Sequence, residues 1–221
     1  MCGISIFISK DNNDVIDNIL KSLYNIQNRG YDSMGISFQQ NSTWDIIKYC
    51  STNESDCYDI LKDKISDIKS SYGIAHTRWA THGSKNNINA HPHISMNKKV
   101  IIVHNGIITN FNIIKKFLID KKYTFVSETD TEVISNLLEY YYLENNDFLK
   151  SIELVIKELE GTWALGIVNT DEPDKIYVCR HGSPLLLGES DKYIVCSSEI
   201  SGFANIVNTY IIIDNNDILT L

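Results

Sequence analysis

The sequence predicts an α+β fold, with layered sheets built from strands at both ends of the chain and helices in the middle. Apolar runs of strand type recur up to residue 103, three helical patterns follow between residues 110 and 159, and strand patterns return after Gly161. This segregation argues against a regular alternation of strand and helix around a parallel sheet. Only three prolines and no Ser/Gly tract occur, so a single domain over residues 1–221 is expected.

The first part of the chain combines short apolar strands with two helices. Residues 14–28 place isoleucine and leucine on one face at helical spacing, and Asp14 stands where it could cap that helix. A second, short helix is expected over residues 58–68. The strands expected in this part cover residues 4–8, 34–38, 44–49 and 72–78, of which the second and third form a hairpin.

A long loop is expected to follow, over residues 79–98. About twenty residues is as long as a structureless loop usually becomes, and such loops are typical of lids and binding loops. An apolar strand over residues 100–103 comes next. It is expected to end at His104, because Asn105-Gly106 is a common sequence for a tight turn.

Two or three helices are expected after this strand, with helical patterns over residues 110–121, 130–144 and 147–159. Thr129 and Glu132 have the spacing of a capping box at the start of the second helix. The strands expected in the last part of the chain cover residues 163–168, 175–180, 185–188, 193–197, 210–213 and 218–221.

The composition argues against several classes of function. The net charge of −8, without a cluster of Lys and Arg, argues against a nucleic-acid partner. No stretch approaches the ~18 apolar residues of a membrane helix, and the apolar run at residues 3–8 is too short for a signal peptide. The five cysteines contain no C-x-x-C pair, which disfavours a disulfide framework or zinc ribbon and fits the reducing cytoplasm.

Cys2 is the first candidate for chemistry. It is small enough for Met1 to be removed, which would place a thiol and a free α-amine on one carbon. An N-terminal amine titrates at roughly 7.7–8.0 and a free thiol near ~8.5. A thiol beside a base is the general design for covalent amide chemistry. The alternative is that Cys2 is a small buried residue leading into a strand.

Three further polar stretches lie at residues 76–83, 104–108 and 127–130. Each has a plain structural alternative: Arg78 could be a surface ion-pair partner, Asn105-Gly106 a turn, and Asp130 a helix N-cap. Five of the six histidines lie in or near these stretches. No Cys, Asp or Glu lies among the first four, so neither a metal site nor a cofactor is expected.

Together, these stretches resemble the class II glutamine amidotransferase domain, and in particular the glutaminase domain of the glutamine–fructose-6-phosphate aminotransferase (isomerising) family, which makes glucosamine 6-phosphate. The similarity extends over essentially the whole chain, and residues 76–83 (HTRWATHG) are its most specific part. The other segments that carry it are residues 2–4, 29–33, 89–93, 104–108, 127–133, 161–164 and 183–185.

The resemblance implies an N-terminal-nucleophile (Ntn) hydrolase fold, a four-layer αββα sandwich with two mostly antiparallel sheets. It implies that L-glutamine is hydrolysed to L-glutamate and ammonia through a γ-glutamyl thioester on Cys2, with the α-amine of Cys2 as the base. The side-chain amide of Asn105 and the backbone N–H of Gly106 would hold the oxyanion.

The resemblance also implies a clamp for the amino-acid end of glutamine. Arg78 would bind the α-carboxylate as a planar fork, which a lysine could not copy. Asp130 would bind the α-ammonium, and Thr81 and His82 would add contacts at the carboxylate. A second implication is a lid: Arg29 and the loop from Trp79 onward would close over the site, with Trp79 as a gate for ammonia.

In this family the synthases continue into two sugar-isomerase domains, which are not expected within residues 1–221. The ammonia would therefore pass to a sugar-isomerase domain or subunit. Residues 26–28 are closer to the amidophosphoribosyltransferases, and Met34 and Glu199 also depart from the usual pattern. Two alternatives stay open: an amidotransferase subunit with another acceptor, such as phosphoribosyl diphosphate, and a silent glutamine-binding regulatory module. A third, an N-terminal-cysteine hydrolase of another amide, is disfavoured by the pairing of Arg78 with Asp130.

Overall fold

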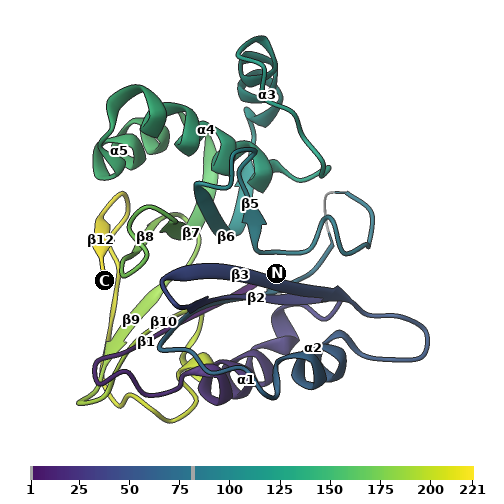
Figure 1. The fold of residues 1–221 in the computed structure, drawn as a ribbon, viewed down its shortest axis with the longest axis vertical. Coiled ribbons are helices and arrows are strands. Elements are labelled where there is room, and N and C mark those ends of the chain that lie inside the picture. Colours follow the sequence, from purple (N-terminus) through teal and green to yellow (C-terminus); the bar gives the residue numbers. More distant parts are fainter. Residues whose placement is uncertain (1, 81–82) are drawn as a thin grey trace.

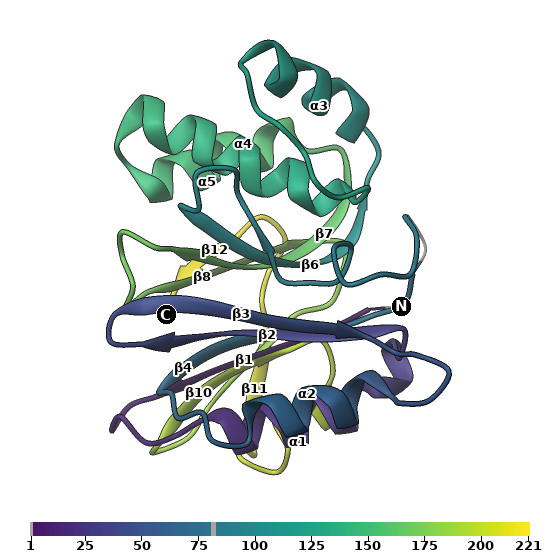
Figure 2. The same cartoon turned by 45° about the vertical axis from the view of Figure 1, so that its right-hand side comes forward.

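Two antiparallel β-sheets lie face to face with helices on their outer sides, in a computed structural model that describes residues 2–80 and 83–221 (Figures 1 and 2). Figure 2 shows the four layers in order, with α3, α4 and α5 above the five-stranded sheet and α1 and α2 below the seven-stranded sheet. The predicted α+β class and the four-layer αββα arrangement are confirmed. Met1, Thr81 and His82 lie outside the described residues.

The seven-stranded sheet has the order β11-β9-β10-β1-β4-β2-β3. In its centre β1 pairs with β10 and with β4, and Gly3 lies opposite Thr77. Cys2 therefore lies just before the first residue of a central strand, next to Arg78 at the end of β4. The strands are β1 (Gly3–Ser9), β2 (Ser33–Gln40), β3 (Thr43–Cys50), β4 (Tyr72–Arg78), β9 (Leu186–Glu189), β10 (Tyr193–Ser197) and β11 (Tyr210–Ile212).

The five-stranded sheet has the order β12-β8-β7-β6-β5. Its strands are β5 (His93–Ile94), β6 (Val100–Ile108), β7 (Gly161–Asn169), β8 (Ile176–His181) and β12 (Ile218–Thr220). The tight turn predicted at Asn105-Gly106 is wrong, because β6 continues through both residues, which pair with Ala164 and Trp163 of β7. Gly106 has a φ of 138°, which gives the strand a local conformation that favours glycine without ending it.

The loop predicted over residues 79–98 is also not structureless, since β5 interrupts it and pairs with β6. The Lys48 ammonium from the neighbouring β3 donates to the carbonyls of Ile88, Ala90 and Pro92 at 3.2, 2.6 and 3.0 Å. These three bonds tie the loop to the edge of the seven-stranded sheet.

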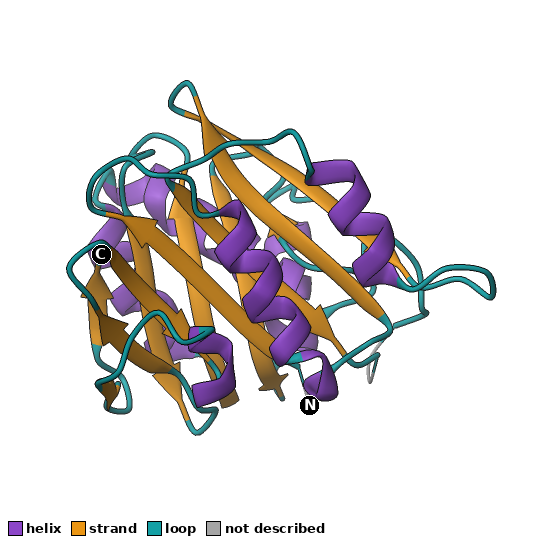
Figure 3. Ribbon diagram, turned by 90° about the horizontal axis from the view of Figure 1, so that it is seen from below, coloured by secondary structure: helices purple, strands orange, loops and turns teal. Residues whose placement is uncertain are grey.

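Seven helical segments are described: α1 (Ile16–Asn25), η1 (Gln27–Arg29), α2 (Cys57–Ile65), α3 (Phe111–Asp120), α4 (Asp130–Asn145), α5 (Phe148–Glu158) and η2 (Ile200–Phe203). Figure 3 shows α1 and α2 lying across the outer face of the seven-stranded sheet. Between the sheets lies an apolar layer that includes Ile6, Ile74 and Val103. None of the helices in the described part of the chain is long and apolar enough to cross a lipid bilayer.

Two predicted helix caps take other forms. Val15 occupies the N-cap of α1, and Asp14 Oδ1 accepts from the N–H groups of Ile16 and Ser70 at 3.2 and 3.1 Å. The capping box at α4 is wrong, because the Thr129 hydroxyl lies 3.1 Å from His93 Nε2 and makes no cap bond. Glu132 instead accepts from the N–H groups of Val126 and Ser127, at 2.9 and 2.7 Å. This carboxylate therefore holds the segment that leads into α4 and its first residue, Asp130.

Candidate active site

Cys2 lies where the ends of β1 and β4 approach β6 and the start of α4, and it lines two cavities. One is a narrow cleft that also includes Arg78, Asp130 and Gly106. The other has a volume of about 270 Å³ and includes Asn105, Gly106 and Arg29. The reading of Cys2 as a merely buried residue is therefore not supported, because its side chain borders both spaces.

The Cys2 thiol is held by the backbone of Trp79. The Trp79 N–H donates to Sγ at 3.4 Å, and Sγ lies 3.7 Å from the Trp79 carbonyl oxygen. Burial raises the pKa of Cys2, an effect that the hydrogen bond with Trp79 and the charges of Arg78 and Arg29 partly offset. The resting group is therefore a thiol, and a base would have to take its proton before it could act as a nucleophile.

Asn105 and Gly106 bring hydrogen-bond donors to the other side of Cys2. The Asn105 side chain is buried, and its Oδ1 lies 3.0 Å from His76 Nε2 while its Nδ2 donates to Ser198 Oγ at 2.8 Å. The next residue, Gly106, lines both cavities. Two N–H groups on consecutive residues beside a thiol are the arrangement that stabilises a tetrahedral oxyanion.

The cleft contains one cation and one anion. Arg78 is only 4% exposed, so the alternative reading as a surface ion-pair partner is wrong. Asp130 is the first residue of α4, after the N-cap Thr129, and its Oδ2 accepts from the Ile108 N–H at 2.9 Å. A guanidinium and a carboxylate in one cleft complement the charges of a free amino acid, which carries an α-carboxylate and an α-ammonium.

Four buried histidines lie at the cleft, and two of them, His91 and His104, line it. The rings of His76 and His91 stack with centroids 4.0 Å apart, and His93 meets His91 edge-on at 4.8 Å. Burial lowers the pKa of His76 to about 3 and also lowers those of His91, His93 and His104. These rings are therefore neutral near pH 7. Residues 2–80 and 83–221 contain no group of His, Cys, Asp and Glu side chains arranged to hold a metal ion.

Comparison with known proteins decides the family. Residues 76–205 match the family model described as a glutamine amidotransferase domain. The chain belongs to this family. The sequence resemblance to a glutamine amidotransferase domain is thereby confirmed.

Similar curated proteins include glutamine–fructose-6-phosphate aminotransferases (isomerising). A probable one from Acanthamoeba polyphaga mimivirus is 37% identical, over 98% of this chain and 36% of its own length. That of Thermococcus kodakarensis is 38% identical, over 98% of this chain and 35% of its own. The amidotransferase domain described here thus spans about a third of the length of these relatives.

Solved structures confirm the fold. The glutamine phosphoribosylpyrophosphate amidotransferase from B. subtilis has a TM-score of 0.84 at 21% identity, over 99% of this chain and 47% of its own. A glutamine aminotransferase class-II domain protein from Silicibacter pomeroyi has a TM-score of 0.63 at 14% identity, over 99% of this chain and 94% of its own. At these identities the likeness concerns the fold alone.

Two residues of the expected lid lie directly at Cys2 of this amidotransferase domain. Arg29 Nε donates to the Cys2 carbonyl at 2.8 Å, and its Nη1 lies 3.3 Å from Glu199 Oε2. The Trp79 side chain is 42% exposed and meets the ring of Tyr31 edge-on at 5.4 Å. Arg29 thus fixes the backbone of Cys2, and the half-exposed Trp79 ring lies at the edge of both cavities.

Sequence reasoning missed the contacts that His76 and Ser198 make with Asn105. His76 was visible within the motif at residues 76–83, but nothing in the motif indicates its partner. Ser198 is a serine at the end of a strand, and it contacts Asn105 across 93 positions of sequence. No local pattern could have indicated that contact.

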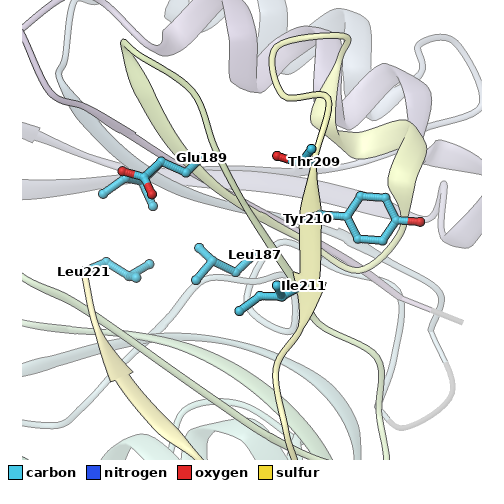
Figure 4. Close-up of a pocket in the computed structure, with 7 residues that line it drawn as sticks. Leu187, Glu189, Thr209, Tyr210, Ile211 and Leu221 are labelled. Atoms are coloured by element: carbon cyan, nitrogen blue, oxygen red, sulfur yellow. The ribbon is translucent and has the colours of Figure 1, made fainter.

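A separate groove of about 420 Å³ lies at the β9 and β11 edge of the amidotransferase domain (Figure 4). Leu187, Ile211 and Leu221 line it together with Glu189, whose carboxylate pairs with Lys10. It shares no lining residue with the two cavities at Cys2. Its lining is mostly apolar and includes none of the candidate site residues, so the candidate active site is the one at Cys2.

Proposed function

We propose that this chain is the glutaminase part of a glutamine–fructose-6-phosphate aminotransferase (isomerising). It hydrolyses L-glutamine to L-glutamate and ammonia through a γ-glutamyl thioester on Cys2, and the ammonia serves the synthesis of glucosamine 6-phosphate. The position of Cys2 supports this most directly: Arg78 and Asp130 share its cleft, and Asn105 and Gly106 share the adjoining cavity.

The substrate is held by its charged end. Arg78 offers two parallel N–H donors to the α-carboxylate, and Asp130 accepts from the α-ammonium. The family resemblance would give Thr81 and His82, which lie outside the described residues, further contacts at the carboxylate. An amide within a peptide has neither charge, which argues against an N-terminal-cysteine hydrolase of another amide.

The reaction begins when Cys2 Sγ attacks the side-chain amide carbon of glutamine and the α-amine of Cys2, free after loss of Met1, takes the thiol proton. The carbonyl electron pair moves to the oxygen, which accepts from the Asn105 amide and the Gly106 N–H. The C–N bond of the amide then breaks, the protonated α-amine of Cys2 returns its proton to the leaving nitrogen, and ammonia departs. Water attacks the thioester by the same route and releases glutamate and the thiol.

The ammonia passes to a sugar-isomerase domain or subunit, while Arg29 and the loop from Trp79 onward close over the site and exclude water. Relatives at 37–38% identity that bear the aminotransferase name support this acceptor. Phosphoribosyl diphosphate has weaker support, because the likeness to the B. subtilis enzyme rests on 21% identity. Five free cysteines support a cytoplasmic location.

The proposal predicts that the purified chain releases glutamate and ammonia from L-glutamine in a ratio of one to one. Cys2→Ala removes the nucleophile and is expected to leave no turnover above background. Glutamate is measured by a coupled dehydrogenase assay, and glutamine binding by calorimetry. Binding of glutamine by the unmodified protein without turnover would instead identify a silent regulatory module, and turnover by Cys2→Ala would exclude the thioester route.

A second prediction concerns Gly106→Ala. A Cβ at this position would lie 2.0 Å from the Thr162 carbonyl oxygen, and the φ of 138° is unfavourable for alanine. The β6–β7 pairing must shift, which moves the Gly106 N–H away from the oxyanion. We expect kcat to fall by about 10²–10³-fold.

Gly161→Ala is the matched control, because Gly161 has a φ of 118° and its added Cβ would lie 2.1 Å from the Ile107 carbonyl oxygen. It lies in the same strand pair but does not line either cavity at Cys2. Both variants should unfold at lower temperature, and only Gly106→Ala should lose its kcat. Equal losses of kcat in the two variants would show that general strain is the cause.

A further inference from the structure

The nucleophile and the oxyanion donor belong to different sheets. Cys2 immediately precedes β1 of the seven-stranded sheet, whereas Asn105 lies within β6 of the five-stranded sheet. The ladder hydrogen bonds of either sheet cannot fix the distance between them. Side chains that cross the space between the sheets must do so.

Two buried polar side chains cross this space at Asn105. Ser198 follows β10, and its Oγ accepts from the Ile4 N–H of β1 and from Asn105 Nδ2, each at 2.8 Å. His76 lies on β4, opposite Ile4, and its Nε2 approaches the His104 carbonyl oxygen at 2.9 Å and Asn105 Oδ1 at 3.0 Å. The Asn105 amide is thus held at both of its ends by residues that neighbour the nucleophile strand.

These contacts determine the orientation of the Asn105 amide. The His104 carbonyl can only accept, so His76 Nε2 must bear the proton. The atom of Asn105 that faces this N–H must therefore be the oxygen, because an NH₂ group there would oppose donor to donor. Nδ2 then lies on the side of Ser198, with one N–H bonded to the serine and the second left for a substrate.

We propose that Ser198 and His76 are positioning residues that hold the Asn105 amide in register with Cys2, so that its remaining N–H meets the oxyanion. The inference rests on the glutaminase activity proposed above. Neither residue touches the substrate; each acts through Asn105. Oxyanion stabilisation depends on donors already in place when charge develops, so a loosened amide lowers the rate even though the donor is still present.

The segment that contains Ser198 also holds the nucleophile. Glu199, the next residue, lies 3.3 Å from Arg29 Nη1, and Arg29 Nε donates to the Cys2 carbonyl at 2.8 Å. Two consecutive residues after β10 therefore fix both the backbone of Cys2 and the side chain of Asn105. Displacement of this segment would therefore shift both the Cys2 backbone and the Asn105 side chain.

The first test is Ser198→Ala. We expect kcat for glutamine to fall by about 10-fold to 10²-fold, with KM changed by less than about twofold, because the clamp for the amino-acid end is intact. Alkylation of Cys2 by iodoacetamide should keep its rate, since displacement of iodide develops no oxyanion. The control is Ser5→Ala, a buried serine on β1 whose hydroxyl has no hydrogen-bond partner within the described residues, and it should keep kcat.

A double-mutant cycle with Asn105→Ala tests whether the serine acts through the amide. In the Asn105→Ala background, Ser198→Ala should lower kcat by less than about twofold, because the group that it positions is gone. His76→Gln, which keeps a side-chain N–H, should retain more of kcat than His76→Leu.

Several results would overturn the inference: an unchanged kcat in Ser198→Ala, a parallel loss of alkylation rate, or independent, multiplicative losses in the double mutant. Glutamate release by the unmodified protein distinguishes these results from failure of the proposed glutaminase function. If it releases no glutamate from glutamine, the glutaminase assignment fails. If it is active and Ser198→Ala equals it, only the positioning role fails.

Discussion

A chain that keeps Met1 is expected to hydrolyse glutamine about 10²–10⁴-fold more slowly than the mature chain that begins at Cys2, because it lacks the α-amine that we propose as the general base. Within the described residues, the hydrogen-bond partners of Cys2 Sγ are the backbone N–H and C=O of Trp79, and neither can take a proton. Burial raises the pKa of the thiol, so few molecules carry a thiolate before substrate binds. Intact mass and glutamate release, measured on one sample, test the dependence on the free amine.

The most direct form of this experiment uses a protein with a cleavable leader peptide that ends immediately before Cys2. One preparation is assayed before and after cleavage, so that both forms share the same folding history. Activity should appear in proportion to the fraction of chains whose mass shows a free Cys2. If the uncleaved protein turned over glutamine at the full rate, the α-amine could not be the base.

Sequence patterns predicted those elements that depend on local apolar runs. The strands expected at residues 72–78 and 193–197 coincide with β4 and β10, because each contains a short apolar stretch that is too short for a helix. The pattern failed at Asn105-Gly106, where a local turn signal competes with pairing to Trp163 and Ala164. A distant partner strand decides that conformation, and the dipeptide does not indicate it.

The candidate site was predicted through resemblance rather than periodicity. Nothing in the spacing of Cys2, Arg78 and Asp130 indicates that they share a cleft, since they lie on separate elements that the two sheets bring together. The orientation of the Asn105 side chain could not be predicted from the sequence for the same reason. It depends on contacts with His76 and Ser198 across the space between the sheets. Local sequence thus indicates strands, and the packing of two sheets makes the site.

The buried histidines predict a steep loss of stability between pH 7 and pH 5. His76, with its pKa lowered to about 3 by burial, stays neutral in the native state, whereas the unfolded chain binds a proton near pH 6.5. The unfolded state therefore holds more protons throughout this range, and the free energy of unfolding falls as the pH falls. For His76 alone the loss from pH 7 to pH 5 is about 2 kcal/mol. His91, His93 and His104 shift in the same direction, mainly through burial, and add to it.

Urea unfolding at intervals between pH 5 and pH 7 measures this dependence, and the window excludes most of the carboxylate titration at lower pH. His91→Phe keeps a ring in the stack with His76 and removes one titrating group. The free energy of unfolding of this variant should therefore fall less steeply between pH 7 and pH 5 than that of the unmodified protein. The slope is the decisive quantity, because the substitution also changes the absolute stability through the contacts of His91 with His104 and Thr131. A slope equal to that of the unmodified protein would mean that His91 binds as many protons in the native fold as in the unfolded chain between pH 5 and pH 7. The conclusion that the buried His91 ring stays neutral in the folded protein would then be wrong.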